Sequence, residues 1–159
     1  MDPAYGAPPL LVENLGEVTS EETSKLLFEK GLRATIERIT KPGRKIWLVE
    51  QFPESTSSIP EGLARATLFP FASEEFRLNP RLVDVEHRQA FVKNLFDKLS
   101  NEYGVNILPT HNYLCGGGGC QIESDGVPLY RDSNHLSNFG ATYVRPVMLP
   151  IFNKVNNAY

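Results

Sequence analysis

Apolar residues recur at helical spacing near the start of the chain, which predicts an amphipathic helix over residues 19–40. Thr19 and Glu22 match a capping box, with Thr19 as the N-cap residue. Pro42 and Gly43 are expected to end the helix. The predicted apolar side consists of Leu26, Leu27, Leu32, Ile36 and Ile39.

Two further helices are predicted by the same pattern. One spans residues 85–103, followed by Gly104 at a C-cap position. The last runs from Ser137 or Asn138 to Phe152, where Pro146 is expected to kink it and Pro150 to end it. The apolar side of the 85–103 helix consists of Phe91, Val92, Leu95, Phe96 and Leu99, and that of the last helix of Phe139, Tyr143, Val147, Met148 and Ile151.

Short apolar runs between the helices predict buried strands at residues 45–51, which Pro53 stops, and at 105–109. Shorter extended pieces are expected at 10–12 and 127–131.

The alternation of helices and strands predicts an α/β domain with a parallel sheet flanked by helices. Two or three strands are too few for such a sheet, so the architecture is expected to be incomplete at its amino end. We predict that residues 1–159 form a single partial domain, in which residues 1–18 are an irregular lead-in. Residues 53–80 hold four prolines and are expected to form a long surface connection.

Composition narrows the function classes. The chain has 16 basic and 19 acidic residues and a net charge of −3, which gives no electrostatic case for binding nucleic acid. The sequence contains neither a run of 18 apolar residues nor an amino-terminal signal peptide. We therefore expect a cytoplasmic protein if the chain is complete, and any contact with a membrane only through a missing upstream region. No cofactor is expected.

Cys115 and Cys120 are separated by four glycines. A disulfide between them would close a very short loop and pin a local turn. Free thiols are an alternative, and a metal site with His111 is another, although three candidates fall short of the four ligands of a structural zinc site. A disulfide would imply an oxidising compartment, which conflicts with the missing signal peptide unless the chain belongs to a longer parent.

Asp132 and His135 are the residues that point to chemistry. An acid and an imidazole three positions apart in a turn can approach each other, and such a pair can serve as the orienting acid and the base of a serine hydrolase triad. Asp132 could also serve only as a turn or N-cap residue, and His135 only as a polar residue at a helix start. Ser133 and Ser137 are rival nucleophiles, but Ser137 is better explained as a helix N-cap.

The segment around this pair, Pro-Leu-Tyr-Arg-Asp-Ser-Asn-His-Leu-Ser-Asn-Phe-Gly-Ala over residues 128–141, resembles the closing motif of SGNH hydrolases. It is most similar to the SGNH domain fused to membrane-bound acyltransferases of the acyltransferase-3 type. Cys115, Cys120 and the turn at Gly126 also fit this pattern, and the resemblance runs from about residue 45 to 152.

The resemblance implies a flavodoxin-like parallel sheet whose amino-terminal strands are missing. It also implies that Asp132 and His135 are the catalytic acid and base. The family nucleophile lies in a Gly-Asp-Ser segment, and this tripeptide does not occur in the chain. The oxyanion residues of the family, a Gly and an Asn, are not matched in context by Gly16 or Asn14.

These features predict the carboxy-terminal part of a serine-dependent O-acyltransferase or carbohydrate esterase acting on cell-envelope glycans. The partners of the parent protein would be an acyl donor and a glycan acceptor, in a periplasmic or other extracytoplasmic setting. Alone, the chain is expected to be inactive. One alternative is a half-enzyme completed by a second chain, with self-association through an exposed strand edge. The other is a non-catalytic carbohydrate-binding or scaffolding remnant.

Overall fold

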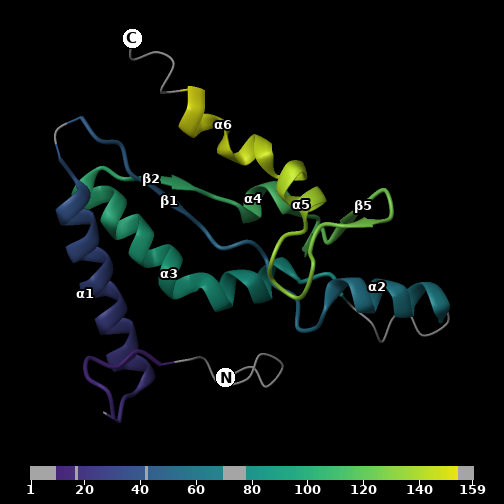
Figure 1. Ribbon diagram of the computed structural model, residues 1–159, viewed down its shortest axis with the longest axis horizontal. Coiled ribbons are helices and arrows are strands. Elements are labelled where there is room, and N and C mark those ends of the chain that lie inside the picture. Colours follow the sequence, from purple (N-terminus) through teal and green to yellow (C-terminus); the bar gives the residue numbers. More distant parts are fainter. Residues whose placement is uncertain (1–9, 17, 42, 70–77, 154–159) are drawn as a thin grey trace. The chain divides into compact units, whose positions relative to one another are not determined.

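The structure is a computed structural model that describes residues 10–16, 18–41, 43–69 and 78–153 (Figure 1). The chain divides into two compact units. The first takes in the described residues up to 48 together with 94–106, and the second takes in 49–93 and the described residues from 107 onward. Helix α3 and the strands β1 and β2 contribute residues to both units.

Helix α1 (Glu21–Ile39) begins one residue later than the capping box predicted. Ser20, not Thr19, is the N-cap residue, and its Oγ accepts a hydrogen bond of 3.1 Å from the Thr23 amide. A serine hydroxyl can satisfy one of the four free amides of a first turn in this way. The predicted capping box of Thr19 and Glu22 is therefore wrong, whereas the end of the helix near Thr40 is confirmed.

The predicted apolar side of α1 is only partly buried. Ile36 is buried, but Leu26 is 67% exposed. Polar contacts also join α1 to the end of α3: Arg33 pairs with Glu102, and Tyr103 Oη donates to Glu37. The predicted strand at 10–12 is also wrong, because these residues form exposed coil with no strand partner in the described part of the chain.

Helix α3 (Leu82–Tyr103) starts three residues before the predicted position and ends as expected. Gly104 follows it with a φ of 66°, in the left-handed region that glycine adopts without strain. Apolar residues spaced along α3 are buried. They are Val85, Leu95, Phe96 and Leu99.

Strands β1 (Trp47–Val49) and β2 (Asn106–Leu108) form a two-stranded sheet and are shorter than the predicted 45–51 and 105–109. The Asn106 amide donates to the Ile46 carbonyl, and the Glu50 amide donates to the Leu108 carbonyl. The two bonds advance in the same direction along both segments, as in a parallel pair. The content of helices and short strands is consistent with an α/β fold of the SGNH type, although no described sheet has more than two strands.

Helix α2 (Ile59–Leu68) lies within the predicted surface connection of residues 53–80, so that part of the prediction is wrong. Pro60 stands in the first turn, where its missing N–H would have no partner in any case. Ile59 and Gly62 are buried, which anchors the helix through one face. Residues 70–77 of the same connection lie outside the described residues.

After β2 come the short helix α4 (His111–Leu114) and two small hairpins. In the first hairpin, β3 (Cys115–Gly116) pairs with β4 (Gly119–Cys120). In the second, β5 (Glu123–Ser124) pairs with β6 (Val127–Pro128). The two central residues of both turns have positive φ: 60° and 88° at Gly117 and Gly118, and 52° and 75° at Asp125 and Gly126. This is the backbone of the primed turns that match the twist of a hairpin.

The predicted last helix is two helices, α5 (Asn138–Tyr143) and α6 (Arg145–Asn153), which follow one another directly (Figure 1). Ser137 is the N-cap residue of α5, as predicted, with its Oγ accepting from the Gly140 amide. The break falls at Val144, just before Pro146. The expected end at Pro150 is wrong, because Pro150 lies inside α6.

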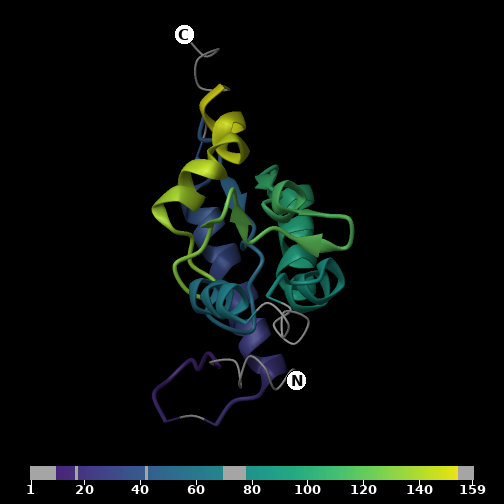
Figure 2. The ribbon, with the colours of Figure 1, turned by 90° about the vertical axis from the view of Figure 1, so that its right-hand side faces the viewer.

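The core of the second unit lies between α2, the hairpins and the α5–α6 pair. Helices α2 and α5 both lie beside β6, and Figure 2 shows the loop between β6 and α5 passing the start of α2. The buried members of this core are Ile59, Leu78, Leu114, Ile122, Leu129, Tyr130 and Val144. Since Leu129 and Tyr130 immediately precede Arg131, the core fixes one end of the loop that carries Asp132 and His135.

Candidate functional site

Asp132 and His135 lie in a tight loop of residues 131–135, here called the dyad loop. An isolated β-bridge between Tyr130 and Leu136 closes it, and the Arg131 amide donates to the His135 carbonyl at 2.9 Å. Tyr130 is 1% exposed, so the closed end of the loop is anchored in the core. This closure places residues 132 and 135 on opposite sides of one short turn.

The structure brings the two side chains into contact. His135 Nδ1 lies 2.9 Å from Asp132 Oδ2. The other carboxylate oxygen, Oδ1, accepts the amides of Asn134 at 2.9 Å and His135 at 2.7 Å. Since the carboxylate can only accept, Nδ1 must carry a proton, and Nε2 of the neutral ring is then the free acceptor. The Asx turn considered for Asp132 and the contact with His135 therefore exist together.

The Asp132 carboxylate is held in its charged form. The amide of Asn134, then the amide of His135, and the His135 ring stabilise the anion and lower the pKa of Asp132 from 3.8 to about 2. The side chains of Asp132 and His135 are 43% and 60% exposed, so solvent reaches both. At neutral pH the site presents an ionised acid and an accessible imidazole.

The lowered pKa predicts a dependence of stability on pH. The stabilisation that ionised Asp132 provides is fully present above pH 4 and disappears as the pH falls towards 2, because the folded state holds the proton less tightly than the unfolded state. Asp132→Asn should therefore lower the urea midpoint at pH 6, and its difference from the wild type should shrink between pH 4 and pH 2. A difference that stayed constant down to pH 2 would contradict the assigned contacts.

Neither serine near the dyad is presented as a nucleophile. Ser137 Oγ donates to the Pro128 carbonyl at 2.9 Å and accepts from the Gly140 amide at 3.0 Å, so its proton and one lone pair are occupied. The Ser133 carbonyl accepts from the Ser55 amide at 2.9 Å, which fixes its backbone. Among the hydrogen bonds of the described residues, none joins a hydroxyl to His135.

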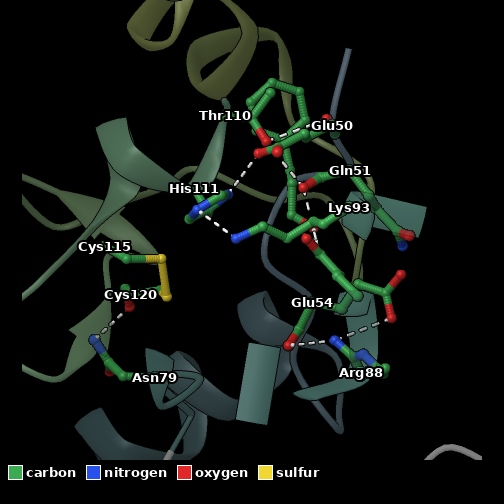
Figure 3. The surroundings of a disulfide bond; sticks show 12 residues. Glu50, Gln51, Glu54, Asn79, Arg88, Lys93, Thr110, His111, Cys115 and Cys120 are labelled. Atoms are coloured by element: carbon green, nitrogen blue, oxygen red, sulfur yellow. Dashed lines mark hydrogen bonds and ion pairs between the residues drawn. A yellow bond between two sulfur atoms is a disulfide. The ribbon is translucent and has the colours of Figure 1, made fainter. Parts of the chain in front are cut away.

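A second histidine, His111, lies in a buried charged cluster at the carboxyl ends of β1 and β2 (Figure 3). His111 Nδ1 is 2.7 Å from Glu50 Oε2, and His111 Nε2 is 3.1 Å from Lys93 Nζ. The Glu50 and His111 side chains are each 8% exposed. Neither Nδ1 nor Oε2 makes a hydrogen bond of good angle, so this contact is a close approach and not an aligned hydrogen bond.

The cluster borders a small cavity of about 90 Å³. Its lining residues are Glu50, Gln51, Glu54, Arg88, Gln89, Val92 and Lys93. Arg88 pairs with Glu54 at 3.2 Å across this lining. The sequence interpretation gave His111 no role beyond the metal alternative, although a signal was present: Glu50 and Thr110–His111 each follow a strand, and the carboxyl ends of parallel strands lie together.

Cys115 and Cys120 are joined by a disulfide with an S–S distance of 2.05 Å. The bonded hairpin holds the start of α3, because the Cys120 amide donates to the Pro80 carbonyl and Asn79 Nδ2 donates to the Cys120 carbonyl (Figure 3). Within the described ranges, no three His, Cys, Asp or Glu side chains are grouped in a way that could hold a metal ion. His111 contacts Glu50 and Lys93 instead.

Removing the disulfide should destabilise the second unit moderately. The bond closes a loop of six residues, for which the chain-entropy relation gives about 2 kcal/mol. Replacing both Cys115 and Cys120 by Ala should lower the free energy of unfolding by about this amount, measured with urea. Adding dithiothreitol should lower the free energy of unfolding of the wild type by the same amount and leave that of the double variant unchanged. Equal stability of the oxidised wild type and the double variant would show that the disulfide does not stabilise the fold.

The comparisons with known proteins identify the family of the chain. A family model described as the SGNH domain fused to AT3 domains matches residues 4–150. The chain belongs to this family. No curated protein and no solved structure matches the chain. The SGNH domain match begins well before residue 45, where the sequence resemblance was expected to start, so it includes α1.

Membership in the SGNH family indicates an acyltransferase-type or esterase-type domain. The description of the family states that its domains are fused to AT3 domains. No helix among the described residues of the SGNH domain has the length and apolar character needed to cross a membrane.

Proposed function

We propose that this SGNH domain supplies the acid and the base for a serine-dependent acyl transfer. The observation that supports this most directly is the contact of 2.9 Å between His135 Nδ1 and Asp132 Oδ2, in a loop that leaves the imidazole exposed. A carboxylate that fixes Nδ1–H directs Nε2 towards a nucleophile, which is the arrangement of a hydrolase triad.

In the proposed reaction, a serine hydroxyl attacks the acyl carbonyl while His135 Nε2 takes the hydroxyl proton. Asp132 stabilises the imidazolium that forms and keeps the ring in the required tautomer. His135 then returns the proton to the leaving group of the acyl donor. In the second half, His135 accepts a proton from the acceptor hydroxyl, or from water, as that oxygen attacks the acyl carbon. It then returns the proton to the serine oxygen as the acyl–serine bond breaks.

The nucleophile is proposed to come from a Gly-Asp-Ser segment outside these 159 residues, either earlier in the same polypeptide or in a second chain. Support comes from the absence of this tripeptide from the sequence and from the occupied hydrogen-bonding capacity of Ser137. We also propose that β1 and β2 are part of a larger flavodoxin-like parallel sheet in the intact domain. The same-direction hydrogen bonds between β1 and β2 favour this arrangement.

The proposed acceptor is a cell-envelope glycan, and the proposed acyl group is acetyl, transferred on the extracytoplasmic side of a membrane-bound parent. The family description, with its AT3 domains, supports the link to a membrane parent. The Cys115–Cys120 disulfide supports an oxidising compartment.

The test is to follow p-nitrophenyl acetate hydrolysis with the intact gene product and with the 159-residue chain. The intact protein should turn over the ester and, after rapid quenching, carry an acetyl group on a serine outside the chain, detectable by mass spectrometry. The chain alone should be nearly inactive. Turnover by the chain alone that is lost with Ser133→Ala or Ser137→Ala would overturn the assignment of the nucleophile.

A further inference from the structure

The dyad loop is held in place by a segment from a distant part of the sequence. The segment of residues 50–59, here called the β1–α2 segment, donates two backbone hydrogen bonds to it. The Ser55 amide lies 2.9 Å from the Ser133 carbonyl, and the Ile59 amide lies 3.2 Å from the Asp132 carbonyl. These bonds hold the middle of the loop, whereas the bonds that Asp132 Oδ1 accepts fix the carboxylate only relative to its own loop.

The opposite end of the β1–α2 segment is held by two buried polar side chains. Thr110, which is fully buried, has its Oγ1 3.1 Å from the Glu50 carbonyl and 2.9 Å from the Gln51 carbonyl. Gln89, from α3, has its Nε2 3.3 Å from the Gln51 carbonyl and 3.4 Å from the Phe52 carbonyl. Both side chains therefore converge on the backbone just after β1.

We propose that Thr110 and Gln89 are positioning residues of the Asp132–His135 dyad. They hold the β1–α2 segment so that its Ser55 and Ile59 amides set the backbone of the dyad loop. The inference rests on the proposed function for its catalytic meaning, but the positioning itself is a structural property. Thr110 and Gln89 would act through the segment and touch neither the dyad nor a substrate.

The physical reason is that buried carbonyls need donors. Without the Thr110 hydroxyl, the carbonyl of buried Glu50 loses its donor while the Gln51 carbonyl keeps Gln89 Nε2, so the segment must shift to find another partner for Glu50. A shift of the segment moves the two amides that hold Asp132 and Ser133. Displacements of about 1 Å at a reacting group lower rates by about 100-fold, so a small movement is sufficient to matter.

The test uses a matched pair at one position, Thr110→Val and Thr110→Ser. Valine keeps the shape of threonine and removes the hydroxyl, whereas serine keeps the hydroxyl. In the isotopically labelled chain, Thr110→Val should speed amide hydrogen exchange at Ser55 and Ile59 by about tenfold or more, while Val144 in the core changes by less than about twofold. The 15N chemical shifts of the His135 ring should also move away from the values typical of the Nδ1–H tautomer. Thr110→Ser should resemble the wild type in every readout.

A folded Thr110→Val protein with wild-type exchange at Ser55 and Ile59, and with an unchanged His135 ring, would overturn the proposal. If Thr110→Val does not fold, Gln89→Met replaces it, since methionine has a similar length but no donor, and the same readouts decide.

Neither the exchange rates nor the His135 ring shifts depend on turnover. If the intact wild type shows no acyl transfer while the exchange changes appear, the proposed function fails and the positioning role stands. If the wild type is active, Thr110→Val should lower kcat by about tenfold or more with little change in KM.

Discussion

Replacing His135 by Ala in the intact, serine-containing protein should lower kcat for acyl transfer by about 10³-fold or more. The imidazole is the proposed base, and its contact of 2.9 Å with Asp132 gives it the tautomer that accepts a proton at Nε2. Asp132→Asn should have a loss of similar size, since an amide can also hold the ring in the wrong tautomer. The measurement is the pre-steady-state rate of p-nitrophenol release together with the steady-state kcat.

His87 provides the control for this substitution. His87 is exposed on α3 and the proposed reaction assigns it no role, so His87→Ala should keep the wild-type kcat. His135 and Asp132 are themselves largely exposed, so the variants at both positions should remain folded. Retention of more than about a tenth of the activity in folded His135→Ala would exclude the proposed base.

Gly140→Ala should destabilise the second unit severely, by roughly 3 kcal/mol or more. A Cβ at residue 140 would lie only 1.8 Å from the Leu129 carbonyl oxygen and 2.7 Å from its carbon. Both are backbone atoms, so no rotamer change can relieve the clash, and α5 would have to move away from the strand that leads into the dyad loop. Urea unfolding followed by circular dichroism measures the loss directly.

Gly116→Ala is the matched control in the same unit. Gly116 is exposed, its φ is not positive, and a Cβ there meets no atom within 4 Å. Its urea midpoint should therefore stay close to that of the wild type. Equal midpoints for the two variants would show that the close approach of α5 to Leu129 is not needed for stability.

The dyad could be predicted from the sequence because its geometry is local. Residues 132 and 135 are three apart in a turn, and the side-chain contact depends on that turn rather than on distant packing. Ser137 could be predicted for the same reason, since an N-cap is recognised from its immediate neighbours. The helices over 85–103 and at the carboxyl end were predictable from their periodicity, although the start of α3 and the division of the last helix into α5 and α6 were not.

Other elements could not be read from local patterns. Pro60 was counted among the prolines of a surface connection, but in the first turn of α2 it is compatible with the helix. The apolar residues of α1 have helical spacing, yet of the predicted side only Ile36 is fully buried, because periodicity shows that a helix has an apolar side and not whether another element covers it. The contacts of Glu50 with His111 and of Thr110 with Gln51 join residues about 60 positions apart, and such pairings depend on which strands are neighbours.

The hydrogen bonds from Ser55 and Ile59 to the dyad loop also have a consequence for the order of folding. They join residues more than 70 positions apart, and closing a chain segment of that length is entropically unfavourable until the contacts it permits have formed. Asp132 and His135 can meet within their own turn at an early stage, before the body of the domain has closed around them. During synthesis, the loop can take its final place only after the ribosome has released residues 131–135, so Asp132 and His135 reach their final positions late in the assembly of the second unit.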